Sequence, residues 1–196
     1  MIAPATASYL AALARRRLEE AVARRYGRPE LVRTEVPPRP ADPLLDTPGR
    51  LFVTWNDGPR LVGCLGQLEP VDTIERTVAR LAMEAGVADP RTEGASPEAL
   101  DRITGEISLL SEPRPLDAVG LAEIAARIRP GVDGVLLTCD GRRAFFLPQV
   151  WEQLPDPASF LVALARKGGM SLERAKRHAR AAVFGAEIVE IPAPNG

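Results

Sequence analysis

Leu61-Val62-Gly63-Cys64-Leu65-Gly66 stands where two contrasting patterns of the sequence meet. Before it, residues 51–56 alternate apolar and polar side chains, and Asp57-Gly58-Pro59 has the composition of a turn. After it, apolar residues recur at helical spacing from about residue 71 to residue 87. The patterns predict a β-hairpin with a return strand at about residues 60–65, a glycine-flanked cysteine loop, and a helix.

Cys64 is the residue of this stretch that could carry chemistry. Gly63 and Gly66 leave its thiol without bulky neighbours, and a helix N-terminus nearby would favour the thiolate. This reading makes Cys64 a nucleophile or a ligand. The alternative is a small buried hydrophobe at the end of a strand. The chain's one histidine, His178, lies in a charged helical stretch, so no Cys/His pair is predicted.

The remaining sequence predicts strands that are joined mainly by turns, together with several amphipathic helices. Asp140-Gly141 suits a type I′ hairpin turn, and Asp72 with Glu75 has the spacing of a helix capping box. Strands paired by turns form an antiparallel sheet, which the helices must cover on at least one face. The fold class is therefore α+β. Helices are expected at about 6–26, 71–87, 96–103, 121–128, 156–166 and 171–179, and further strands at about 105–111, 135–139, 142–147 and 183–191.

Length and composition indicate one globular domain over residues 1–196, with an extended proline-rich connector at 36–49 and a tail at 192–196. The net charge of −1 argues against nucleic acid and anionic membranes as partners. No signal peptide and no apolar run of roughly 20 residues is found. We therefore expect a cytoplasmic protein with free thiols and no Cys64–Cys139 disulfide.

Several polar residues stand in unusual surroundings. Asp89 and Arg91 flank a proline after the long helical stretch, where a local ion pair that stops the helix is the simplest interpretation. Glu106 lies in an apolar strand, and if it is buried it must be paired or protonated, which would mark a site. Lys167 precedes two glycines, as at an ordinary helix C-terminus. No phosphate loop, dinucleotide fingerprint or metal motif is present, so no cofactor or metal is predicted.

Several short motifs follow one another in a specific order. They are Leu61–Gly66, Ala88-Asp89-Pro90-Arg91, Glu106-Ile107-Ser108-Leu109-Leu110-Ser111, Gly131-Val132-Asp133-Gly134, Leu147-Pro148-Gln149-Val150, Phe160-Leu161 and Lys167-Gly168-Gly169. In this order they resemble the AMMECR domain family, the protein A component of the AmmeMemoRadiSam gene sets. The resemblance covers residues 8–191.

The resemblance implies a central antiparallel sheet covered by helices, a smaller flanking subdomain, and a candidate site around the glycine–cysteine stretch. Two positions depart from the family pattern. Val62 replaces an arginine, whose role is then either absent or supplied elsewhere, for example by Arg60, and Thr92 replaces a phenylalanine. The residues at the family's motif positions are Cys64 and Glu106 as catalytic candidates, and Gly63, Gly66, Asp89, Arg91, Asp133, Gln149 and Lys167 as substrate-binding candidates.

Two functional hypotheses follow. In the first, the protein is a small-molecule enzyme or enzyme subunit, with Cys64 as nucleophile or acid and Glu106 as its proton partner. Arg91 and Lys167 would then anchor an anionic ligand. In the second, the protein is a non-catalytic interaction or scaffold module. Under either hypothesis the resemblance implies Memo-type and radical-SAM proteins as partners.

Overall fold

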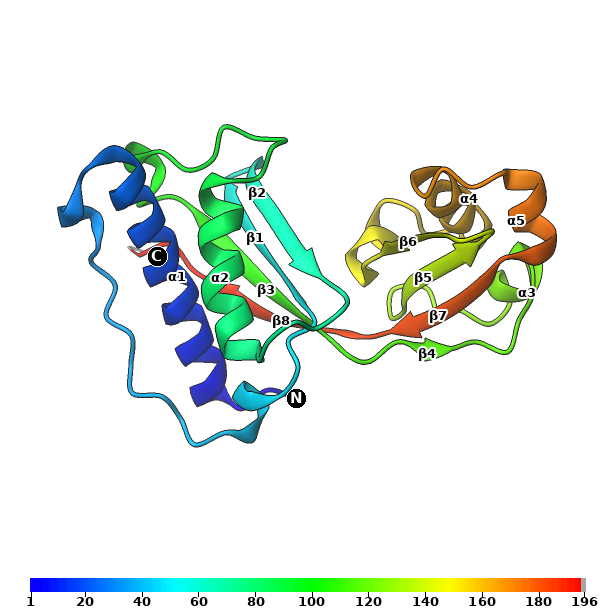
Figure 1. The fold of residues 1–196 in the computed structure, drawn as a ribbon, viewed down its shortest axis with the longest axis horizontal. Helices are drawn as coiled ribbons and strands as arrows, with labels where there is room; N and C mark the ends of the chain where they lie inside the picture. The colour runs from blue at the N-terminus through cyan, green and yellow to red at the C-terminus, as the bar shows by residue number, and fades with distance from the viewer. Residues whose placement is uncertain (195–196) are drawn as a thin grey trace. The chain divides into compact units, whose positions relative to one another are not determined.

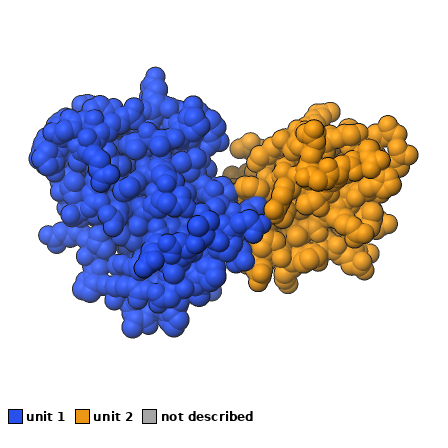
Figure 2. All heavy atoms as spheres, viewed as in Figure 1, with its two compact units in different colours: residues 1–109, 187–196 blue, residues 110–186 orange. Residues whose placement is uncertain are grey.

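The computed structural model describes residues 1–194, which form two compact units (Figure 2). Unit 1 comprises residues 1–109 and the C-terminal segment from Glu187, and unit 2 comprises Leu110–Ala186. Each unit has its own four-stranded antiparallel sheet and its own hydrophobic core. Of the predicted tail, Asn195 and Gly196 lie outside the described residues.

Unit 1 has the strand order β2-β1-β3-β8, so β2 and β8 form the two edges of its sheet (Figure 1). Short 3₁₀ turns occur at Pro29–Leu31, Pro43–Asp46 and Pro97–Ala99. The helices and strands are α1 (Pro4–Tyr26), β1 (Leu51–Asp57), β2 (Arg60–Gln67), α2 (Ile74–Val87), β3 (Thr104–Leu110) and β8 (Ala186–Ile191).

The core of unit 1 lies between this sheet and the helices. α1 packs on α2, and α2 packs on β1 and β2. Alternate residues of β1, namely Leu51, Val53 and Trp55, are fully buried, as expected for the strand face that points to the helices. The indole Nε1 of Trp55 donates a hydrogen bond of 3.0 Å to the carbonyl of Ala82 in α2. The residues between them, including Thr54, therefore point to the opposite face.

Unit 2 has the strand order β4-β7-β5-β6. Its core includes Trp151 and Phe160, whose rings stack with centroids 3.8 Å apart. A 3₁₀ turn occurs at Pro148–Glu152. The helices and strands are β4 (Arg114–Pro115), α3 (Leu121–Ala125), β5 (Gly134–Cys139), β6 (Arg142–Phe146), α4 (Pro157–Lys167), α5 (Leu172–His178) and β7 (Arg180–Phe184).

The structure confirms the predicted α+β class and both predicted hairpins. Asp140 and Gly141 have φ values of 50° and 75°, the positive values that a type I′ turn requires. The predicted last strand, 183–191, is wrong as a single element. It is divided at Gly185, where Ser111 donates its backbone N–H to the carbonyl of Gly185 and accepts the N–H of Gly185 on its hydroxyl. The chain thus passes from the sheet of unit 2 to that of unit 1.

Three further predictions are corrected. α2 begins at Ile74, because the hydroxyl of Thr73 accepts the backbone N–H of Arg76; the predicted Asp72–Glu75 capping box is absent, and Val71 is 84% exposed. The predicted helix at 96–103 is only the 3₁₀ turn Pro97–Ala99. The proline-rich connector is not wholly extended, since it contains the 3₁₀ turn at Pro43–Asp46.

Candidate functional site

Cys64 lies within strand β2, and the predicted glycine–cysteine loop is wrong. Packing accounts for both glycines of this stretch. A Cβ atom on Gly63 would lie 1.9 Å from the carbonyl oxygen of Ala85 in α2, and one on Gly66 would lie 2.1 Å from the ring of Phe52. These glycines therefore let the edge strand and its neighbours approach closely. The thiol of Cys64 is half-buried.

A short segment after α2 binds the outer edge of β2. We call Asp89, Arg91 and Thr92 the edge clip. The Asp89 carboxylate accepts the backbone N–H of Cys64 at 2.9 Å, Arg91 Nη2 donates to the carbonyl of Cys64 at 2.6 Å, and Thr92 Oγ1 donates to the carbonyl of Val62 at 2.6 Å. The outward backbone groups of an edge strand have no neighbouring strand to pair with. The edge clip supplies side-chain hydrogen-bond partners in place of a neighbouring strand.

Asp89 and Arg91 form the ion pair that their spacing predicts. Arg91 donates to the Asp89 carboxylate through Nε at 2.9 Å and Nη2 at 2.7 Å. These hydrogen bonds hold the pKa of Asp89 well below its usual range, although its carboxylate is fully buried and burial acts in the opposite direction. The pKa of Arg91 is raised, chiefly by Asp89 and to a smaller extent by Cys64. The side chain of Arg91 remains 61% exposed.

Three side chains form a row across the sheet of unit 1. Thr54 in β1 lies opposite Cys64 in β2 on one side and opposite Glu106 in β3 on the other. Residues that pair directly share one face of the sheet. Thr54 Oγ1 donates a hydrogen bond of 3.3 Å to Cys64 Sγ. Because neighbouring strands lie about 4.8 Å apart, Cys64 and Glu106 are separated by about 10 Å, with Thr54 between them.

Thr54 was not among the predicted site residues. A regular hairpin that begins with Asp57 opposite Arg60 would place Thr54 opposite Gly63. The observed register shifts between Trp55 and Asn56, so Thr54 faces Cys64 instead. A bulge inserts one residue into one strand and displaces every later pair by one position. The polar Thr54 between buried Val53 and Trp55 was the only signal in the sequence.

The two departures from the family pattern have structural explanations. The side chain of Val62 is buried in the core of unit 1, and its carbonyl accepts the hydroxyl of Thr92. Arg60 pairs with Glu93 at 2.8 Å on the surface, so its guanidinium is engaged away from the row. The hydroxyl of Thr92 thus completes the edge clip.

The other predicted site residues, Asp133, Gln149 and Lys167, lie in unit 2. The Asp133 carboxylate is buried; burial raises its pKa, but hydrogen bonds from the backbone and guanidinium of Arg129 outweigh this and lower it. Lys167 Nζ donates to the carbonyl of Phe145 at 2.9 Å and lies 5.0 Å from the centroid of its ring. Gln149 lies in the 3₁₀ turn Pro148–Glu152.

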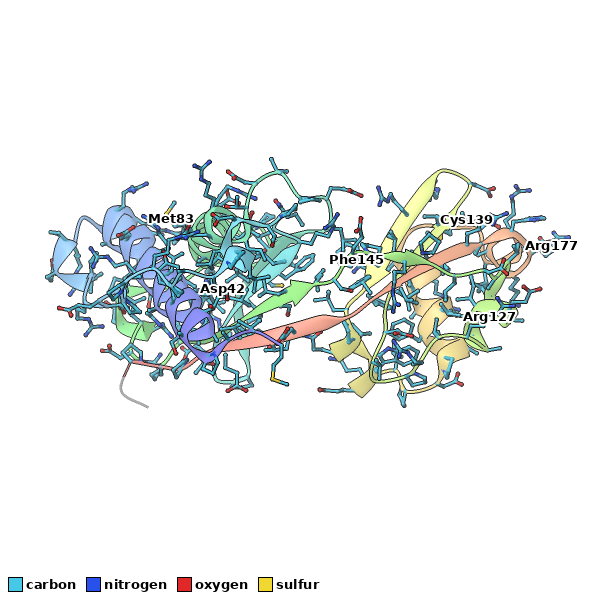
Figure 3. All side chains as sticks on the ribbon, turned by 90° about the horizontal axis from the view of Figure 1, so that it is seen from below. Asp42, Met83, Arg127, Cys139, Phe145 and Arg177 are labelled. Carbon is cyan, nitrogen blue, oxygen red and sulfur yellow. The ribbon has the colours of Figure 1, made fainter. Side chains whose placement is uncertain are left out.

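Cys139 ends strand β5 of unit 2 (Figure 3) and is a free thiol, as is Cys64. Burial raises the pKa of the Cys139 thiol. Among residues 1–194, no group of three or more His, Cys, Asp or Glu side chains is arranged to hold a metal ion. Nor does this part of the chain contain a helix with the length and apolar character needed to cross a membrane.

Comparisons with known proteins agree with the motif order. The chain is 32% identical over 200 residues to a protein of Thermofilum pendens, and the match covers 95% of this chain and 90% of that protein. It is 36% identical over 121 residues to a protein of Methanothermobacter thermautotrophicus, of which it spans only 63%. The crystal structure of the uncharacterized protein PH0010 from Pyrococcus horikoshii has the same fold, with a TM-score of 0.79 at 27% identity over 96% of this chain and 93% of that one. The AMMECR1 family model matches residues 11–189, and the chain therefore belongs to the AMMECR1 family.

Proposed function

We propose that this protein is a small-molecule enzyme or enzyme subunit in which Cys64 is the reactive group. The observation that carries the proposal is the hydrogen bond from Thr54 Oγ1 to Cys64 Sγ. A hydroxyl that donates to sulfur stabilises the thiolate, which is the nucleophilic form. The half-buried sulfur remains open to a small reactant.

Glu106 is the proton partner of Cys64 in this proposal. Their two strands stand about 10 Å apart with β1 between them, so the thiol proton does not pass to the carboxylate in one direct transfer. A water molecule or a polar group of the substrate, lying beside Thr54 on this face of the sheet, carries the thiol proton to Glu106. The thiolate can then add to an electrophilic carbonyl carbon of the substrate, where the π bond to oxygen breaks and its electron pair moves to that oxygen. The protonated Glu106 returns its proton to the same oxygen by the reverse route.

Arg91 is the anchor for an anionic substrate on this unit. Its Nε and Nη2 bind Asp89 and the carbonyl of Cys64, whereas Nη1 makes no hydrogen bond to residues 1–194. Because Asp89 balances the charge of Arg91, the guanidinium would bind a ligand mainly through directed hydrogen bonds and less through net positive charge. Lys167, the other predicted anchor, belongs to unit 2. The partners under this proposal are Memo-type and radical-SAM proteins, which would supply or consume the small molecule.

The test is the rate of Cys64 alkylation by iodoacetamide against pH, in a Cys139→Ser background. A midpoint well below the ordinary thiol value of about 8.5 supports the proposal. Thr54→Val should slow alkylation at pH 7 by about two- to tenfold, the equivalent of one hydrogen bond. Thr54→Ser keeps the hydroxyl and is the matched control. An ordinary midpoint that neither variant changes would exclude an activated thiol.

A second candidate, the scaffold module, is favoured by a different observation. Every hydrogen bond of the edge clip to β2 ends on a backbone group, as in a purely structural device. Under this hypothesis the motif preserves a sheet edge near a protein contact, and Cys64→Ser leaves partner binding unchanged. Co-purification of tagged wild-type and Cys64→Ser protein with Memo-type and radical-SAM proteins tests this candidate, because loss of partner binding in Cys64→Ser would contradict it.

A further inference from the structure

A groove of about 850 Å³ runs along unit 1, away from the motif residues, none of which lines it. One wall is the small-residue face of α1, which includes Ala7, Ala11 and Ala12. The other is the edge strand β8 and the segment that follows it, which run beside α1 in Figure 1. A mostly apolar groove of this size with a few polar groups is typical of a small-molecule site.

Arg15 of α1 lines this groove and has unused hydrogen-bonding capacity. Its side chain is buried, since the residue is only 4% exposed. Nη2 donates to the carbonyls of Ile103 and Pro192 at 2.6 and 2.8 Å, and the guanidinium lies 5.1 Å from the ring centroid of Trp55. Nε and Nη1 are buried and have no hydrogen-bond partner in residues 1–194. Buried guanidinium donors without acceptors are costly.

The acidic residues near Arg15 limit the charge of a ligand. The Glu19 carboxylate is already occupied, because it accepts the backbone N–H groups of Arg33 and Thr34 and the Thr34 hydroxyl. Glu190 also lines the groove. Glu19 and Asp101 both act electrostatically on Arg15. Arg33, a second cation that lines the groove, is paired with Asp101. This balance of charge favours a ligand with a single negative charge over one with two.

We propose that this groove binds a small carboxylic acid with an apolar body, whose carboxylate pairs with Arg15. The apolar body lies along the alanine face of α1, and the carboxylate accepts hydrogen bonds from Nε or Nη1. Both nitrogens are buried, so the ligand reaches them as the wall at residues 192–194 moves aside. This site is separate from the proposed reactive row at Cys64.

The test uses the full chain and cis-parinaric acid, a fluorescent long-chain carboxylic acid, with its methyl ester as the uncharged control. The acid should bind saturably at one site, and the ester about tenfold more weakly or worse, the equivalent of a charged hydrogen bond. Arg15→Met should reduce binding of the acid to that of the ester. Equal binding of acid and ester, or binding at many sites, would overturn the proposal.

A second pair of variants leaves Arg15 intact, in case its loss prevents folding. Ala12→Trp fills the groove and should abolish binding, whereas Ala5→Trp, at an exposed position of the same helix outside the groove, should not. If Ala12→Trp binds the acid as tightly as the wild type does, the acid does not bind in this groove. Decanoate should also displace the probe better than decyl phosphate at pH 8; the reverse order would refute the preference for a single charge.

Discussion

Gly63→Ala is the substitution for which the structure predicts the largest effect at the site. The added Cβ would lie 1.9 Å from the carbonyl oxygen of Ala85, 3.0 Å from its carbonyl carbon and 3.3 Å from Cβ of Asp89. The nearest of these is a backbone atom of α2, which cannot rotate away as a side chain could. Either β2 or the end of α2 must therefore move by more than 1 Å, since an ordinary contact between carbon atoms is about 3.5–4.0 Å.

Overpacking of this kind typically costs about 1–3 kcal/mol, and contact with backbone places Gly63→Ala at the upper end. For a protein of this length, about 3 kcal/mol corresponds to a decrease in Tm of about 6–12 °C. Urea unfolding followed by circular dichroism measures the free energy of unfolding. Because β2 carries Cys64 and the edge clip binds this strand, the same variant should also expose Cys64 to faster alkylation.

Gly185→Ala is the matched control. Its nearest neighbour would be the Ser111 hydroxyl oxygen at 3.9 Å, and its φ is not in the left-handed region. An alanine there should be neutral or stabilise by about 0.4–1 kcal/mol, because it restricts the unfolded chain. If Gly63→Ala unfolds within 0.5 kcal/mol of the wild type, the close packing of β2 on α2 is not what requires a glycine.

Three further outcomes are expected. Asp89→Asn should lower the free energy of unfolding at pH 7 by about 1–3 kcal/mol, because the buried carboxylate loses charged hydrogen bonds. The pKa of Asp89 is lower in the folded protein than in the unfolded chain, where it is about 3.9. The carboxylate therefore makes its full contribution to stability above about pH 3.9, and this contribution declines as the pH falls below that value. The free energies of unfolding of wild type and Asp89→Asn, measured by urea titration, should converge towards about pH 2. Thr92→Val should lower the free energy of unfolding by about 1 kcal/mol, because the hydrogen bond from the Thr92 hydroxyl to the carbonyl of Val62 is lost. Thr92→Ser keeps a hydroxyl, so an equal loss of stability in that variant would contradict this explanation. The difference in stability between wild type and Asp133→Asn should shrink in the same way as pH falls, measured by Trp151 fluorescence in unit 2, because Arg129 lowers the pKa of Asp133 in the folded protein.

The sequence predicted those parts of the fold that depend on neighbouring residues. The Asp140-Gly141 turn is an example, since two adjacent residues with positive φ determine both the turn and the register of β5 with β6. The Asp89–Arg91 pair is another, because the partners are two positions apart. The break at Gly185 could not be seen, because it depends on hydrogen bonds to Ser111, which is 74 positions away.

The candidate site was only partly predictable for the same reason. The motif order indicated Cys64 and Glu106, but Thr54 lies between them in the sheet, and that residue faces Cys64 only because of the register shift between Trp55 and Asn56. Nothing in the local pattern of residues 51–65 requires a bulge at that position. The hydrogen bond between the Asp89 carboxylate and the backbone N–H of Cys64 also joins residues that are 25 positions apart. Long-range packing thus decided which of the predicted residues touch.

The edge clip and Thr54 contact different parts of Cys64, and this difference separates the two functional hypotheses. The clip binds the backbone of Cys64, so changes in Asp89 or Arg91 should alter stability and thiol accessibility together. Thr54 binds only the sulfur through its hydroxyl, so Thr54→Val should alter reactivity with little effect on the backbone. If the alkylation rate and the free energy of unfolding change in proportion across all these variants, the rate reflects only local unfolding around Cys64. The scaffold module is then the better interpretation. If Thr54→Val departs from that proportion, the sulfur has an environment adapted for chemistry.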